Sequence, residues 1–187
     1  MCRADCRDDL GLTVPNMPST SFLRICRADY ANPAHGAALV HLLDAYARDP
    51  MGGGEPLSEF ARTHLVPALA ARPQAFSVLA FGEIDCKGSE RPVGLVNCIE
   101  GFSTFACQPL VNVHDVVVLP EHRGQRVAEK MLALVEQIAR ERGACKLTLE
   151  VLQGNAGAIN LYTRVGFASY QLDPAMGQAQ FLQKWLK

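Results

Sequence analysis

A short basic turn separates an apolar stretch from a helical stretch in the second half of this sequence. The apolar stretch (VNVHDVVVLP, residues 111–120) is rich in β-branched side chains and ends at a proline, which predicts a buried strand. The turn carries Arg123, Gly124 and Arg126, and residues 127–142 have the apolar spacing of an amphipathic helix. Because the first N–H groups of a helix lack partners within it, this arrangement predicts an anion-binding site.

A second group of residues combines two polar side chains with a small one at helical spacing. Asn155, Ala158 and Tyr162 stand at positions i, i+3 and i+7, so they share one stripe of a helix. The small residue leaves room for a slender ligand, and the Asn and Tyr side chains can hydrogen-bond to its polar groups. Two other interpretations stay open, since Asn155 could act only as a helix N-cap and the ring of Tyr162 could lie in the core.

Both segments resemble motifs of the GNAT superfamily of N-acetyltransferases. The turn RGQRVA, residues Arg123–Ala128, is similar to the coenzyme A loop of that family, except that Arg126 replaces the central Gly. Residues 147–167 resemble the closing motif of the family and match it at Asn155, Ala158, Tyr162, Gly166 and Phe167. The expected order of strands and helices is similar as well, so the sequence from residue 22 onward is identified as a member of this superfamily.

The resemblance implies acetyl-coenzyme A as co-substrate and no metal ion. In the family the strands that match residues 111–119 and 146–152 diverge, and the pantetheine arm pairs with the backbone of the first, here Val116, Val117 and Val118. The resemblance places the pyrophosphate on a contiguous segment, namely Arg123, Gly124, Gln125, Arg126, Val127, Ala128 and Glu129. It places the pantetheine and the thioester against the stripe of Asn155, Ala158 and Tyr162.

Acetyl transfer from a thioester to an amine needs a neutral amine, hydrogen-bond donors at the thioester oxygen and a proton for the leaving thiolate. Tyr162 suits the role of proton donor, because an ordinary phenol has a pKa of about 10. Three residues are candidates for the base, with Glu150 ranked first, His114 second and Asp115 third. Each of the three could instead be a buried side chain in a structural hydrogen bond.

The ranking of the bases rests on resemblance to two branches of the superfamily. Glu150 resembles the catalytic Glu of the ribosomal-protein N-terminal acetyltransferases. His114 and Asp115 hold the position of an acidic pair in the spermidine/spermine acetyltransferases, where His114 replaces a Glu. Because neighbouring side chains on a strand point to opposite faces, His114 and Asp115 can both face a site only if a β-bulge intervenes.

The expected function is therefore direct acetyl transfer from acetyl-coenzyme A to a primary amine of a small molecule or a peptide. The alternative is a catalytically silent acyl-coenzyme A-binding regulatory module, for which Arg126 is the best argument. Tyr162 and Glu150 argue against that alternative. A third reading is an unrelated α/β protein in which the loop occurs by chance. The sequence does not identify the acceptor, and it leaves the oligomeric state open, a homodimer included.

The spacing of apolar residues predicts the elements that position these groups. We expect strands at residues 22–28, 75–82, 92–103, 111–119, 146–152, 167–171 and 180–186, and helices at 33–48, 57–72, 127–142 and 155–165. Strands 75–82 and 92–103 should form an antiparallel hairpin, residues 102–109 a short excursion, and Pro67 a kink or a split in its helix. The glycines at 52–54 make either a mobile loop beside the site or a plain linker.

This order predicts the α/β class, as an α+β mixed sheet covered by helices. The resemblance adds an acetyltransferase-like fold with a central, mostly antiparallel sheet and splayed strands. Two apolar stripes should meet the sheet. One belongs to the helix at 127–142 and consists of Val127, Ala128, Met131, Leu132, Leu134, Val135, Ile138 and Ala139. The other is the strand face formed by Leu147, Leu149 and Val151.

Composition limits the domain count and the partners. The 187 residues, 49% of them apolar, predict a single domain at 21–187 after a disordered tail at 1–20. A net charge of −1 argues against nucleic-acid binding, and no apolar run approaches the length that spans a membrane. Seven cysteines without a CxxC motif favour free thiols over disulfides or a zinc site. With no signal-peptide pattern, a cytoplasmic location is expected.

Overall fold

The computed structural model describes residues 23–84, 90–170, 173, 175 and 180–186. Within them one sheet has the strand order β1-β2-β3-β4-β5. The strands are β1 (Leu23–Arg27), β2 (Ala75–Ile84), β3 (Glu90–Ser103), β4 (Gln108–Val118) and β5 (Leu147–Leu149). Strands β1 to β4 pair antiparallel and β5 pairs parallel to β4, which confirms the predicted α/β class and the mostly antiparallel sheet.

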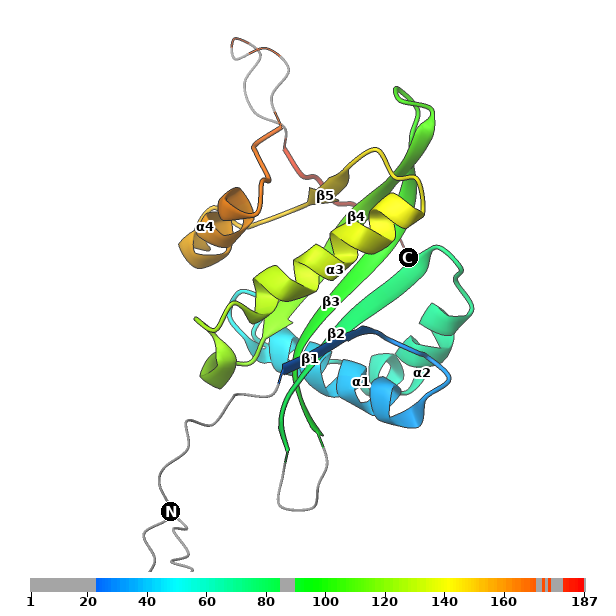
Figure 1. Ribbon diagram of the computed structural model, residues 1–187, viewed down its shortest axis with the longest axis vertical. Helices are drawn as coiled ribbons and strands as arrows, with labels where there is room; N and C mark the ends of the chain where they lie inside the picture. The colour runs from blue at the N-terminus through cyan, green and yellow to red at the C-terminus, as the bar shows by residue number, and fades with distance from the viewer. Residues whose placement is uncertain (1–22, 85–89, 171–172, 174, 176–179, 187) are drawn as a thin grey trace, which may run out of the picture.

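Helices cover both faces of the sheet. The helices are α1 (Pro33–Arg48), α2 (Glu59–Ala70), α3 (Val127–Glu141) and α4 (Ala156–Arg164), and a short 3-10 turn η1 (Pro120–His122) follows β4. Figure 1 shows α3 across the front of the sheet and α1 and α2 behind it, with α4 beside the edge that β5 forms. The sheet is therefore the middle layer of three.

Local capping explains where the first two helices begin. The side chain of Asn32 accepts a hydrogen bond from the N–H of Ala34, and the ring of Pro33 suits the first turn of α1. Ser58 caps α2 by accepting from the N–H of Ala61. Pro67 lies inside α2, but α2 is one continuous helix that ends three residues later at Ala70, so the predicted split does not occur.

Each face of the sheet has its own apolar core. Under α3 most of the predicted stripe is confirmed, since Val127, Met131, Leu132, Val135, Ile138 and Ala139 are buried. Leu134 packs against them half-buried, whereas Ala128 is half-buried outside this core. On the opposite face, Leu39 and Leu42 of α1 pack against Leu79, Leu95 and Val117 of the sheet. The hydrophobic burial of both faces fixes the sheet between the helices.

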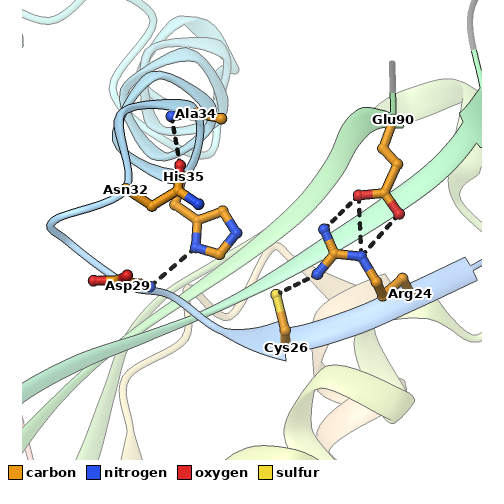
Figure 2. Close-up of polar contacts among 7 residues, drawn as sticks. All are labelled: Arg24, Cys26, Asp29, Asn32, Ala34, His35 and Glu90. Atoms are coloured by element: carbon orange, nitrogen blue, oxygen red, sulfur yellow. Dashed lines mark hydrogen bonds and ion pairs between the residues drawn. The ribbon is translucent and has the colours of Figure 1, made fainter. Parts of the chain in front are cut away.

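The edge strand β1 is also held by an ion pair that crosses the sheet. Figure 2 shows the guanidinium of Arg24 against the carboxylate of Glu90, with a further hydrogen bond to the sulfur of Cys26. The same guanidinium lies 4.5 Å from the ring centroid of Phe81. Hydrogen bonding from Arg24 holds the pKa of Glu90 below its ordinary value, so the pair stays ionised at neutral pH.

An extra residue in β4 changes which face its side chains occupy. Asn97 of β3 pairs with Asp115, whereas the next residue, Cys98, pairs with Val113, so His114 has no partner in β3. Val113 belongs to the core under α3, and Val117 belongs to the core under α1. The pairing of β4 with β5 ends at Val113, so the two strands separate from the bulge onward, as the predicted splay requires.

Several predicted element boundaries are wrong. β5 ends at Leu149 instead of residue 152, because β4 leaves it after the bulge. Val151 is consequently 38% exposed and does not share the inner face with Leu147. Residues 102–109 are not an excursion, since β3 continues to Ser103 and β4 begins at Gln108, which extends both arms of one hairpin.

The prediction of two closing strands, at residues 167–171 and 180–186, is also wrong for the part of them that the structure describes. Residues 167–170 and 180–186 have irregular backbone and pair with no described strand. Their apolar side chains lack a sheet to cover, and Phe181, Leu182 and Trp185 are exposed. The alternation of side chains in these segments does not produce strands, because a strand also needs a partner edge for its hydrogen bonds.

Some predictions fall on residues outside the described ranges, among them the tail at 1–20 and Cys2, Cys6 and Cys86. Cys26, Cys98, Cys107 and Cys145 are free thiols. In the described ranges, no helix combines the length and the apolar character that crossing a membrane requires. Nor do three His, Cys, Asp or Glu side chains gather there as potential metal ligands.

Candidate active site

A cavity of about 660 Å³ opens where β4 and β5 separate. Its size suits a small-molecule ligand. Three groups of predicted cofactor-binding residues line it: Val116, Val117 and Val118 of β4; Arg123, Gly124, Arg126, Val127, Ala128 and Glu129 of the loop and α3; and Asn155, Ala158 and Tyr162 at α4. Gln125 was predicted with them but does not line the cavity; its side-chain amide donates to the carbonyl of Glu121 at 3.3 Å.

One end of this cavity has the features of an anion site. Gly124 has a φ of +78°, and no heavy atom lies within 4 Å of the position that a Cβ would take, so the turn is open on that side. Arg126 precedes α3 with φ 59° and ψ 24°, and no side chain caps the helix there. The N–H groups at the start of α3 therefore keep their hydrogen-bonding capacity beside a cavity lined by three arginines, which fits a phosphate group.

The arginines around the cavity differ in their partners. Arg123 forms an ion pair with Asp49 at 3.1 Å, and its Nε donates to the carbonyl of Val118. Arg164 of α4 donates to Glu129 in the first turn of α3, with 2.9 Å between Nε and Oε1. Arg126 forms no ion pair with any residue that the structure describes. Its charge is thus available to a ligand.

Another wall of the cavity is formed by α4, which contacts the first turn of α3 through Arg164 and Glu129. Asn155 caps this helix by accepting from the N–H of Ala158 at 3.1 Å, and it lines the cavity as well. Tyr162 packs partly against the core under α3, and its ring meets that of Phe167 edge-on. The structural and the ligand-binding interpretations of Asn155 and Tyr162 are therefore compatible. Each side chain has a structural contact, as a helix cap or as a core ring, and each also borders the cavity.

Burial raises the pKa of Tyr162. Removal from water is the main cause that raises its pKa to about 12, and the nearby Tyr46 adds to the effect. A phenol with this pKa is protonated throughout the neutral range. It can therefore donate a hydrogen bond or a proton at the α4 end of the cavity.

The three candidate bases lie along β4 and just after β5, and none of them lines the cavity itself. Glu150 is exposed, and its carboxylate lies 3.4 Å from the side-chain amide of Asn112. His114 is exposed at the bulge. Asp115 is half-buried and accepts a hydrogen bond from the amide of Asn97 at 3.0 Å. The bulge that would let His114 and Asp115 share a face is present.

Several residues of the cavity were not predicted from the sequence. They are Tyr46, Asp49 and Met51 at the end of α1, together with His122, Gly157, Leu161 and Arg164. The glycine-rich turn after α1 was the available signal for the first group, although Gly52, Gly53 and Gly54 themselves do not line the cavity.

Comparison with known proteins agrees with this geometry. Residues 39–167 match the family model described as the Acetyltransferase (GNAT) family. The chain belongs to this family. It is similar to the streptothricin acetyltransferase of Streptomyces lavendulae, with 38% identity over 89 residues, 46% of this chain and 47% of that protein. The chain thus matches less than half of the length of this GNAT relative.

Solved GNAT structures share the fold. A probable acetyltransferase has a TM-score of 0.70 and 22% identity, with 88% of this chain and 99% of that chain covered. An aminoglycoside N-acetyltransferase, AAC(6′)-Iy in complex with CoA, has a TM-score of 0.66 and 15% identity, with 90% of this chain and 98% of that chain covered. At these identities the likeness establishes the fold, and the chemistry has to be argued from the site.

Proposed function

We propose that this chain is an N-acetyltransferase that takes its acetyl group from acetyl-coenzyme A and transfers it to a primary amine of a small molecule or a peptide. One observation carries the proposal: a single cavity is lined by an uncapped helix start, by three arginines and by a half-buried tyrosine that is protonated at neutral pH. A co-substrate that carries both phosphate groups and a thioester needs an anion site and a hydrogen-bond donor in the same cavity. The names of the relatives support the same class of reaction.

The residues of the cavity suit the parts of the co-substrate. The start of α3, with Gly124 and Arg126, would hold the pyrophosphate through N–H groups and positive charge. The backbone of β4 from Val116 to Val118 has no β5 partner and would pair with the amides of the pantetheine arm. The amide nitrogen of Asn155 would donate to a pantetheine carbonyl, since the carbonyl oxygen of the side chain already caps α4.

When bound, acetyl-coenzyme A supplies an acetyl group activated as a thioester. Tyr162, which is protonated at neutral pH, would donate a hydrogen bond or a proton to the leaving thiolate. Glu150 would accept the proton of the amine, directly or through water, because its carboxylate is exposed at the point where β5 ends. His114 and Asp115 are the next candidates for this proton.

A direct test is thiol release from acetyl-coenzyme A in the presence of a panel of amines, with mass spectrometry of the products. The panel contains lysine, spermidine, an aminoglycoside and short peptides with free N-termini. Acetylation of at least one amine, together with release of free coenzyme A, is the expected outcome. Binding of acetyl-coenzyme A without transfer to any amine would instead support the silent acyl-coenzyme A-binding module.

A further inference from the structure

The helix α4, which carries Tyr162, is held to the rest of the protein by few contacts. It lies beside the edge of the sheet (Figure 1), and none of its residues is fully buried. Leu161 and Tyr162, with Val165 just after the helix, pack half-buried against the core under α3. Among the residues that the structure describes, the side-chain hydrogen bonds from α4 to another element are those of Arg164 with Glu129. This ion pair is therefore a main determinant of where α4 lies.

The guanidinium of Arg164 holds one oxygen of the Glu129 carboxylate through two of its nitrogens. Nε lies 2.9 Å and Nη2 lies 2.6 Å from Oε1, although the two residues are 35 positions apart in the sequence. Both residues line the cavity. In the described part of the chain Nη1 of Arg164 has no acceptor, so part of its capacity to donate is left for a ligand.

Glu129 occupies an unusual place for a carboxylate in an anion site. It stands in the first turn of α3, where a negative charge is favourable as long as no ligand is bound. A phosphate at the same helix start would be repelled by it. Arg164 neutralises this carboxylate and adds donors that face the cavity, so the ion pair makes the presence of Glu129 compatible with phosphate binding.

The same ion pair connects the anion site to Tyr162. Arg164 and Tyr162 are two positions apart on one helix, so a force that holds the first also holds the second. A phosphate oxygen at the start of α3 can accept a hydrogen bond from Arg164 while Glu129 keeps its own. Such charge-assisted hydrogen bonds are stronger than an exposed ion pair, so α4 would be held more firmly against α3 once phosphate is bound.

We propose that Arg164 is a positioning residue that couples the binding of phosphate groups at the start of α3 to the placement of Tyr162. This inference rests on the proposed acetyltransferase function and gives the phosphates of acetyl-coenzyme A a part in turnover as well as in affinity. Binding energy from a part of a substrate that does not react can raise the rate when it positions a catalytic group. Arg164 makes that connection in this chain.

Hydrogen exchange of the α4 amides tests this coupling without any turnover. Since few buried contacts hold α4, its amides should exchange fast in the free protein. Saturating coenzyme A should slow them at least fivefold, whereas pantetheine, which has no phosphate, should slow them little. In Arg164→Gln the protection by coenzyme A should fall to the level that pantetheine gives. Dephospho-coenzyme A shows whether the pyrophosphate or the 3′-phosphate is responsible.

Steady-state kinetics with the amine that gives the fastest thiol release supplies a second readout. Arg164→Gln should lower kcat about two- to fivefold, the size of one exposed ion pair, and leave the KM of the amine unchanged. Arg164→Lys keeps the positive charge and should restore part of kcat. In the Tyr162→Phe background Arg164→Gln should add nothing, because no hydroxyl is left to position.

Arg140→Gln is the matched control for Arg164→Gln. Arg140 also forms an exposed ion pair, with Glu136 on the same helix α3, but neither residue lines the cavity. The control should leave kcat, both KM values and the exchange of the α4 amides as in the wild-type protein. A change in the control like that in Arg164→Gln would contradict the inference, because it would show a general effect of removing a surface charge.

The outcomes distinguish this inference from the function on which it rests. If coenzyme A protects no part of the wild-type protein and no amine releases thiol, the proposed function fails and the inference fails with it. If coenzyme A binds but protects α4 equally in the wild-type protein and in Arg164→Gln, the inference alone is overturned. Additive losses of kcat from Arg164→Gln and Tyr162→Phe would also overturn it, because Arg164 would then act independently of the Tyr162 hydroxyl.

Discussion

The ring of Tyr162 meets the ring of Phe167 edge-on, with 5.9 Å between their centroids. This contact fixes the end of α4 against the chain that leaves it, where the N–H of Phe167 also donates to the carbonyl of Tyr162. The ring is thereby held in apolar surroundings while its residue borders the cavity. We propose the hydroxyl of this packed ring as the proton donor.

Tyr162→Phe removes only that hydroxyl and keeps the ring contact. Turnover should fall roughly ten- to a thousandfold, which is within the range for the loss of a proton-transfer group. The affinity for acetyl-coenzyme A, measured by titration calorimetry, should change much less. Tyr170→Phe, at a tyrosine that is 64% exposed, is the matched control and should leave turnover unchanged. Full activity of Tyr162→Phe would rule out its role as the acid.

The stability of the protein should fall at alkaline pH. Burial raises the pKa of Cys98 from 9.0 and of Tyr162 from 10.0, each to about 12, and it also raises the pKa values of Tyr30 and Tyr46. The folded state therefore keeps these protons at pH values where the unfolded chain has lost them. Their contribution to stability is complete below about pH 9 and is lost as the pH rises toward 12.

Thermal unfolding between pH 7 and pH 11 checks this expectation. The melting temperature should be level up to about pH 9 and then decline. Cys98→Val removes one of the four groups without opening a large cavity, so its decline should be shallower. A wild-type melting temperature that stays constant to pH 11 would show that these groups titrate alike in the folded and unfolded states.

The backbone of Arg126 has a left-handed conformation that residues other than Gly rarely adopt. Relief of this strain in Arg126→Gly should stabilise the protein by on the order of 1 kcal/mol, about 2–4 °C in melting temperature. The same variant should bind coenzyme A about two- to fivefold more weakly, and the difference should shrink at high salt, because an exposed charge pair is screened. Dephospho-coenzyme A should lose less affinity if the 3′-phosphate is the partner of Arg126.

Cys107→Gly is the matched control for Arg126→Gly. Cys107 is the other residue besides glycine with a positive φ in the described ranges, at 51°, and it lies in the turn between β3 and β4. Its replacement should stabilise the protein similarly and leave coenzyme A binding unchanged. Tighter binding by Arg126→Gly would mean that Arg126 obstructs the loop, and it would favour the silent-module alternative.

A direct comparison of variants identifies the general base that accepts the proton of the amine. Glu150→Gln should lower turnover by about a hundredfold or more, as expected for loss of a general base, whereas His114→Ala should stay near the wild-type rate. Both side chains are exposed, so neither change should alter the melting temperature much. An active Glu150→Gln with an inactive His114→Ala would reverse the ranking.

The parts of the site that depend on local spacing could be predicted from the sequence. Helix periodicity places Asn155, Ala158 and Tyr162 on one stripe, and a strand, a glycine turn and a helix start place Gly124 and Arg126 at the beginning of α3. These relations involve residues close in sequence. The helices α1, α3 and α4 were predicted correctly for the same reason.

The parts of the fold and of the site that depend on pairing between distant segments could not be predicted from the sequence. The bulge at His114 exists only relative to Asn97 and Cys98 of the neighbouring strand, and the early end of β5 follows from it. The packing of α1 over the sheet brings Tyr46 to the cavity. Likewise, the ion pair of Arg164 with Glu129 depends on how α4 lies against the start of α3, which no local pattern encodes.

The most direct test of the central claim, that the cavity between β4 and α4 is an acetyl-coenzyme A site, is the melting temperature with and without millimolar acetyl-coenzyme A. A ligand bound only by the folded state raises stability by mass action, by about 2.7 kcal/mol at a hundred times its Kd. The account predicts a rise of several degrees, smaller in Arg126→Gly than in the wild-type protein. An unchanged melting temperature would contradict the account, because it would mean that the folded chain does not bind acetyl-coenzyme A.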